Sequence, residues 1–145
     1  MKVSVIIPCY NEEEVLPLSH KRFSQVMGST AHDYELIFVN DGSKDHTEEL
    51  LLGFANDDPH TKVISFSRNF GHQNAVSAGL HNCTGDIAVI PLYGGGDESK
   101  ASGNTAYFVN NGMIYTVCIM APQPGIGDAR LRPYLKQVLD AFYAP

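Results

Sequence analysis

An acidic residue that follows a buried apolar run is the first place where this sequence could do chemistry. Residues Leu36 to Val39 form a continuous apolar run, and Asp41, Gly42 and Ser43 come soon after it. Such a run is expected of a strand that is buried on both faces of a parallel sheet. Ligands of open α/β sheets bind at the carboxyl ends of the strands. The pattern therefore predicts that Asp41 lies where a side chain can take part in recognition or catalysis.

The cysteines and histidines do not point to chemistry of their own. Cys9, Cys83 and Cys118 are odd in number and widely spaced, which fits small, buried, reduced thiols in a cytoplasmic chain. The six histidines show no HExxH-like spacing, so a histidine-based metal site is not expected. Nucleophilic catalysis by Cys9, Cys83 or Ser43 ranks last, because the sequence indicates no base beside any of them.

Length and composition favour an ordinary globular protein. The chain has 145 residues, of which 43% are hydrophobic, and a formal net charge of -6. This length predicts a single domain, residues 1–145, with a substantial core. The negative charge argues against a nucleic-acid partner and against a basic membrane-facing patch. No apolar run approaches the roughly 20 residues that a membrane-spanning helix needs.

The first ninety residues alternate strand-like and helix-like segments. Apolar runs predict strands at residues 3–7, 36–39, 62–66 and 86–90, and apolar residues recur at helical spacing between them. This alternation is typical of right-handed βαβ crossovers. We therefore predict an α/β fold in which residues 1–90 form a Rossmann-like βαβ half-domain with a mainly parallel sheet.

Polar residues indicate where the first two helices begin. Asn11 precedes three glutamates and is suited to cap a helix whose apolar stripe runs from Val15 to Met27. Ser43 is suited to cap a second helix, with Leu50 and Phe54 on its apolar face. The third helix is rich in small residues at positions 75–80, which favours close packing on the sheet.

The pattern changes after residue 90. Residues 91–103 are glycine-rich and polar, which predicts a loop. Asn110, Asn111 and Gly112 separate strand-like runs at 105–109 and 113–120, a strong signal for a β-hairpin. Asp128 is suited to cap a last amphipathic helix. We expect residues 104–145 to complete the domain by adding strands to an open sheet edge and a helix to its uncovered face.

Four blocks, taken in order, carry a family resemblance. They are VSVIIPCYNE at 3–12, ELIFVNDGSKD at 35–45, SRNFGHQNA at 67–75 and TGDIAVI at 84–90. Together they resemble the N-terminal half of family 2 glycosyltransferases, in particular the polyprenyl (dolichyl) phosphate sugar transferases. The resemblance covers about residues 2–90. It implies a GT-A fold, in which a Rossmann-like sheet holds a nucleotide-diphosphate sugar together with a divalent metal, Mg²⁺ or Mn²⁺.

The resemblance also implies which residues meet the nucleotide. It assigns the loop from Pro8 to Glu12, with Tyr10 and Asn11, and also Asp41, to the base and ribose, and it brings Arg68 near the nucleotide. A carboxylate accepts hydrogen bonds from ribose hydroxyls or a base N–H, and a guanidinium offers a planar fork suited to phosphate. The alternative interpretation is that Asp41 only caps the following turn and that Arg68 is a solvated surface charge.

The sequence departs from the family where the metal is expected. In the family, the strand that matches residues 86–90 runs into Asp-x-Asp, and these carboxylates hold the metal. Here Pro91, Leu92 and Tyr93 follow instead, and the next acids are Asp97 and Glu98. These two are either a substitute metal pair or ordinary solvated loop acids.

Three hypotheses follow for the function. The first is an enzyme, a minimal nucleotide-sugar transferase that uses Asp41 and Arg68 for the donor. Only its donor-binding half is visible, and it is expected to be incomplete for catalysis because the sequence shows neither Asp-x-Asp nor an acceptor-side base. The second is a nucleotide-binding module without turnover. The third is a truncated, chimeric or designed folding module without enzymatic activity, for which open sheet edges favour a homo-oligomer.

Overall fold

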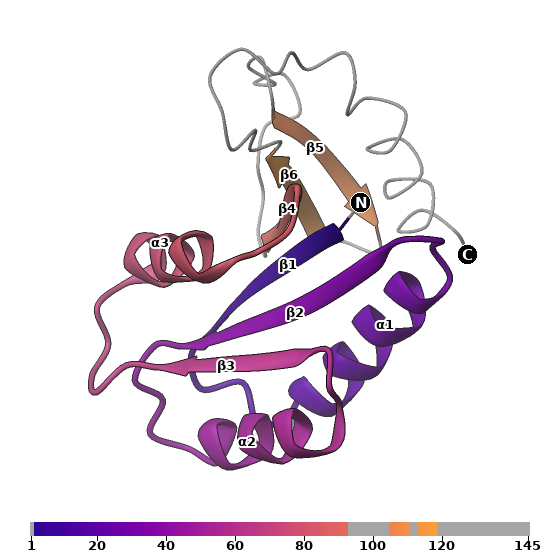
Figure 1. Cartoon of the computed structure of the whole chain (residues 1–145). Helices are drawn as coiled ribbons and strands as arrows, with labels where there is room; N and C mark the ends of the chain where they lie inside the picture. The colour runs from indigo at the N-terminus through magenta and orange to yellow at the C-terminus, as the bar shows by residue number, and fades with distance from the viewer. Residues whose placement is uncertain (1, 93–104, 111–112, 119–145) are drawn as a thin grey trace.

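The computed structural model describes residues 2–92, 105–110 and 113–118, and these residues form a six-stranded sheet. The strand order is β3-β2-β1-β4-β6-β5 (Figure 1). The strands are β1 (Lys2–Cys9), β2 (Asp33–Asn40), β3 (Thr61–Ser65), β4 (Ile87–Leu92), β5 (Thr105–Asn110) and β6 (Met113–Cys118). The first four are parallel to one another, and β6 runs antiparallel to both β4 and β5. The predicted α/β fold with a mainly parallel sheet is confirmed.

Helices cover both faces of the sheet. Helices α1 (Leu16–Gly28) and α2 (Thr47–Asp57) lie on one face, and α3 (His72–Asn82) lies on the other (Figure 1). Successive side chains of a strand point to opposite faces. In β1, therefore, Val5 packs with the core under α1 and α2, whereas Ile6 packs under α3. Within the described part of the chain, no helix is both long and apolar enough to cross a membrane.

The third helix lies very close to the sheet, as its small residues predict. A Cβ atom placed on Gly79 would lie 2.3 Å from the Cγ2 atom of Ile6, so no larger residue fits there without movement. Ala75 is fully buried on the same side of the sheet. Small side chains therefore set the distance between α3 and β1.

The strand order reverses direction at β1. The chain passes from β1 through β2 to β3 on one side, and then returns across the other face to place β4 on the opposite side of β1. A reversal of this kind creates a crevice at the carboxyl ends of the strands, where ligands of open α/β sheets bind. The loops that leave β1, β2 and β3 gather at this edge, on the left of Figure 1.

The hairpin extends the sheet beyond β4, as predicted. The strand expected to end at Ile90 continues instead through Pro91 and Leu92, because these two residues pair with Tyr115 and Ile114 of β6. The predicted loop therefore begins later than residue 91. The helix expected after Asp128, and the acids Asp97 and Glu98, lie outside the described residues.

Both predicted helix starts are wrong by several residues. Helix α1 begins at Leu16 rather than after Asn11, and α2 begins at Thr47 rather than after Ser43. Asn11 has a positive φ of 51°, whereas a helix N-cap adopts an extended conformation. The side chains expected to cap the helices join the two loops instead, since Asn11 N–H donates to Ser43 Oγ at 3.0 Å. Val15, expected in the apolar stripe of α1, is 48% exposed.

A buried carboxylate in β2 ties neighbouring parts of the sheet together. Glu35 is 2% exposed. Its Oε1 atom accepts hydrogen bonds from Ser4 Oγ in β1 at 2.6 Å and from Thr84 N–H, before β4, at 2.7 Å. Its Oε2 atom pairs with Lys62 of β3 and lies 3.4 Å from the ammonium of Lys2. Burial acts to raise the pKa of Glu35, but the hydrogen bonds from Lys62, Ser4 and Thr84 outweigh it and lower this pKa to about 2.

Replacing Glu35 tests this network through the pH dependence of stability. Because the pKa in the folded state lies below the ordinary 4.5, the carboxylate stabilises the fold above about pH 4.5, and this contribution is lost as the pH falls towards 2. Glu35→Gln should lower the free energy of unfolding by about 2 kcal/mol at pH 7. The free energy of unfolding of this variant, measured by urea titration, should also decrease less between pH 4.5 and 2 than that of the wild type. Equal pH slopes for the variant and the wild type would contradict the network, and Asp33→Asn, at an exposed carboxylate, is the control.

Adding a methyl group at Gly42 should push two loops apart. Gly42 has φ of +68°, and its Cβ would lie 2.2 Å from the carbonyl carbon of Arg68 and 2.4 Å from the nitrogen of Asn69. We expect Gly42→Ala to lower the free energy of unfolding by more than about 2 kcal/mol, since both the conformation and the contact are unfavourable. Gly53→Ala is the matched control, because a Cβ there meets nothing within 4 Å and helix propensity favours alanine. Equal stability changes in thermal unfolding would argue against this packing.

Candidate functional site

The loops after β1 and β2 are held together by hydrogen bonds between backbone and side chains. Asn11 N–H donates to Ser43 Oγ at 3.0 Å, and Lys44 N–H donates back to Asn11 Oδ1 at 2.8 Å. Glu12 N–H donates to Thr47 Oγ1 at 2.9 Å. Asp41 N–H donates to the carbonyl of Cys9 at 2.8 Å, which continues the pairing of the two strands into the loops. The two loops therefore form one unit.

The end of β1 and the loop after it carry four of the residues predicted to meet the nucleotide. Pro8 is half-buried, Tyr10 is 42% exposed, Asn11 is exposed, and Glu12 is half-buried. Burial, together with the nearby charge of Asp45, raises the pKa of the Glu12 carboxyl. Tyr10 is the aromatic side chain that this loop presents to solvent.

Cys9, in the same segment, is a structural thiol. Its side chain is 1% exposed, and burial, reinforced by the charge of Glu12, raises the pKa of the thiol far above its usual range. A thiol that stays protonated is a poor nucleophile. The prediction that Cys9 is a small buried side chain is confirmed. Cys83 is half-buried, and burial followed by the charge of Glu35 raises the pKa of its thiol.

Asp41 lies under the loop that follows β3. Its side chain is 4% exposed, and each carboxylate oxygen accepts a backbone hydrogen bond: Oδ1 from Phe70 N–H at 2.7 Å and Oδ2 from Gly71 N–H at 3.1 Å. The preceding residue also holds this loop, since the carbonyl of Asn40 accepts from Phe66 N–H at 2.9 Å. Asp41 therefore connects the ends of β2 and β3.

Arg68 lies on the exposed surface of the same loop. Its guanidinium carbon is 4.5 Å from the centre of the Phe70 ring, a distance typical of a cation–π contact. The Phe70 ring meets Phe66 edge to face, with centroids 5.6 Å apart, and is 44% exposed. Arg68 is thus a cation whose position is restricted by an aromatic ring.

The structure brings the predicted residues to one edge of the sheet. Pro8 lies near the end of β1, and Tyr10, Asn11 and Glu12 lie on the loop that follows it. Asp41 lies on the second loop, and Arg68 on the third, which packs against Gly42. Sequence reasoning did not single out Phe70 or Asn40. Phe70 could have been identified from the sequence, because it lies inside the SRNFG block two residues after Arg68. The sequence marks Asn40 only as the polar residue that ends an apolar run.

The end of β4 does not supply a metal site among the described residues. Pro91 and Leu92 end the strand where the family resemblance implies carboxylates, and neither has a polar side chain. In residues 2–92 and the two hairpin strands, no three His, Cys, Asp or Glu side chains are grouped to hold a metal ion. The described residues therefore do not fit the implied divalent metal.

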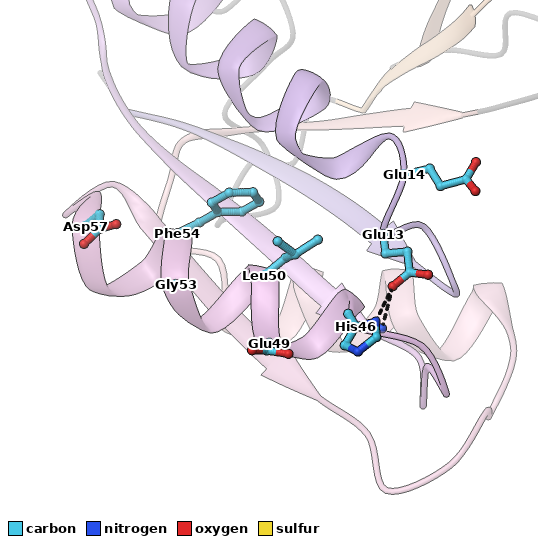
Figure 2. A pocket seen from close by; sticks show the side chains of 8 residues that line it. All are labelled: Glu13, Glu14, His46, Glu49, Leu50, Gly53, Phe54 and Asp57. Carbon is cyan, nitrogen blue, oxygen red and sulfur yellow. Dashed lines mark hydrogen bonds and ion pairs between the residues drawn. The ribbon is translucent and has the colours of Figure 1, made fainter.

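A separate pocket lies on the α2 side of the molecule. It is an open hollow of about 670 Å³, and Figure 2 shows Leu50 and Phe54 among acidic side chains. Glu13 reaches from the loop after β1 to His46, with Oε2 2.8 Å from Nδ1, and the pKa of His46 is raised by this hydrogen bond and by the charge of Glu13. An acidic lining is unsuited to phosphate. None of the residues predicted to meet the nucleotide lines this pocket.

Comparison with known proteins places the chain in a family. Residues 4–91 match the family described as Glycosyl transferase family 2. The chain is 46% identical over 90 residues to the uncharacterized glycosyltransferase YkcC of Bacillus subtilis (strain 168), covering 62% of this chain and 28% of that protein. It is 42% identical over 92 residues to the prophage bactoprenol glucosyl transferase homolog of Escherichia coli (strain K12), covering 63% of this chain and 30% of that protein. The chain thus spans less than a third of either relative's length.

Solved structures show the same fold. The S. aureus TarS 1-349 structure matches with a TM-score of 0.53 and 23% identity, over 62% of this chain and 26% of that one. The same TarS fragment in complex with UDP gives the same values. The likeness concerns the GT-A fold, whose mainly parallel sheet and flanking helices correspond to the arrangement described above. With its family match over residues 4–91, the chain belongs to glycosyltransferase family 2.

Proposed function

We infer that the carboxyl edge of β1, β2 and β3 binds the nucleoside diphosphate part of a nucleotide sugar. The observation that carries this proposal is the joining of three loops, because the loops that carry exposed Tyr10 and exposed Arg68 both contact the turn after β2. One is an aromatic surface and the other a cation. A nucleotide needs both kinds of contact, for its base and for its phosphates.

The loop after β1 suits the base and ribose. Tyr10 offers a partly exposed ring on which a base can stack, and Pro8, two residues earlier, is half-buried. Asn11 and Glu12 add polar groups next to that ring, while their backbone amides are held by Ser43 and Thr47. Because the loop is fixed before the ligand arrives, binding costs less ordering entropy.

Arg68 suits the diphosphate. Its planar guanidinium offers several N–H donors to phosphate oxygens, and its contact with Phe70 limits the positions it can take. The chain carries a net charge of -6, so a cation at this edge is needed to offset repulsion of an anionic ligand. Lys44 is exposed on the neighbouring loop and adds a second positive charge.

Sugar transfer is the finer proposal for the same site. Two relatives are named as bactoprenol glucosyl transferases, so a glucosyl donor and a polyprenyl acceptor are the first substrates to test. Transfer with Mg²⁺ or Mn²⁺ would require carboxylates such as Asp97 and Glu98 to hold the metal. The second candidate is nucleotide binding without transfer, which is favoured by Pro91 and Leu92 where the family has Asp-x-Asp.

Calorimetric titration with UDP and with GDP tests the proposal. The wild-type chain should bind one of them in the presence of Mn²⁺, and Arg68→Ala should weaken binding about tenfold, because it removes a charge-assisted contact to phosphate. Lys21→Ala, at an exposed lysine of α1, is the matched control and should leave the affinity unchanged. Absence of binding at millimolar nucleotide would overturn the proposal.

A further inference from the structure

The carboxylate of Asp41 is already occupied by the protein itself. It is 4% exposed, and its two oxygens accept from Phe70 N–H at 2.7 Å and Gly71 N–H at 3.1 Å. A buried carboxylate requires such donors, since an ionised group without them is costly to bury. The donors belong to a loop that is 29 and 30 residues further along the chain. Asp41 therefore fixes the backbone of that loop.

The two amides that donate to Asp41 lie at the start of helix α3. Gly71 is the N-cap residue of α3, so both amides lie immediately before the first turn of this helix. Gly71 has no side chain with which to cap the helix, and Asp41 instead holds the two amides that come just before it. Its negative charge is also favourable at the positive end of the helix dipole. The direction in which the loop enters α3 therefore depends on Asp41.

The same contacts determine where the guanidinium of Arg68 lies. The backbone of Phe70 is held on both sides, because its N–H donates to Asp41 and its carbonyl accepts from Asn74 Nδ2 at 2.6 Å. The ring of that residue lies 4.5 Å from the guanidinium carbon. A continuous path of contacts thus runs from the Asp41 carboxylate through Phe70 to Arg68.

We propose that Asp41 is a positioning residue, which acts on a bound nucleotide by holding Phe70 and, through its ring, Arg68. This inference rests on the proposed function, and it differs from the assignment of Asp41 to the base and ribose. Asp41 lies below the loop, and Arg68 on its outer surface meets the phosphates. Loss of the carboxylate therefore affects phosphate contacts that are made by another residue.

Hydrogen exchange of individual amides tests the first step without any ligand. In Asp41→Asn, one of the two amides loses its acceptor and faces an NH₂ group, so exchange at Phe70 or Gly71 should become about tenfold faster. The matched control is Asp86→Asn, whose Oδ2 accepts from Lys2 N–H at 2.9 Å before β4. This control should leave both rates unchanged. Unchanged exchange at both amides in Asp41→Asn would overturn the proposal.

A double-mutant cycle tests the second step. Binding of UDP or GDP, whichever the wild type binds more tightly, is measured for Asp41→Asn, Arg68→Ala and the double variant. If Asp41 acts through Arg68, each single variant loses about tenfold in affinity and the double variant loses little more than Arg68→Ala alone. Losses that multiply would show an independent contact from Asp41 and would overturn the proposal.

A second variant keeps the test decisive if Asp41→Asn fails to fold. Phe70→Leu removes the ring beneath Arg68 but retains the backbone amide that Asp41 accepts from. It should weaken nucleotide binding about as much as Arg68→Ala while exchange at Gly71 stays slow. Full affinity in Phe70→Leu would overturn the path through the ring. Failure of the wild type to bind either nucleotide would overturn the proposed function, and the exchange rates would still decide whether Asp41 holds the loop.

Discussion

A carboxylate that is almost removed from water must find hydrogen-bond donors, and this requirement shapes the carboxyl edge of the sheet. Asp41 finds its donors in the backbone of Phe70 and Gly71, which brings the loop after β3 over the turn after β2. That approach is possible because Gly42 leaves room for the backbone of Arg68. The loop after β1 joins the same turn through Asn11. Three loops, distant in sequence, thus depend on one short turn.

Near the opposite end of β2, a second buried carboxylate also finds hydrogen-bond donors, in other parts of the chain. Glu35 is buried in β2 and accepts from Ser4 and Thr84, while Lys62 provides the opposite charge. These partners lie in β1, before β4, and in β3. The apolar middle of the sheet is therefore bounded by two satisfied carboxylates. One stabilises the fold, and the other arranges the loops that carry the proposed site.

The elements were predictable because their signals are local. Continuous apolar runs such as that from Leu36 to Val39 predicted the strands, and the hairpin followed from Asn111 and Gly112 between two strand-like segments. The start of the first helix was not predictable from local signals, because the side chain of Asn11 accepts a hydrogen bond from a loop 33 residues away instead of capping its own helix. The buried partners of Asp41 are equally distant, so the sequence placed this residue at the correct edge without revealing what its carboxylate contacts.

The central claim is that the three loops form one nucleotide-binding unit at the carboxyl edge. Amide chemical shifts of the whole chain, recorded by NMR during titration with UDP or GDP and Mg²⁺, test this claim most directly. We expect shifts concentrated in residues 10–12, 41–45 and 67–71, which belong to the joined loops but do not line the acidic pocket. Shifts confined to the residues that line the acidic pocket, at 13, 14, 46 and 49–57, or no shifts at millimolar nucleotide, would contradict it.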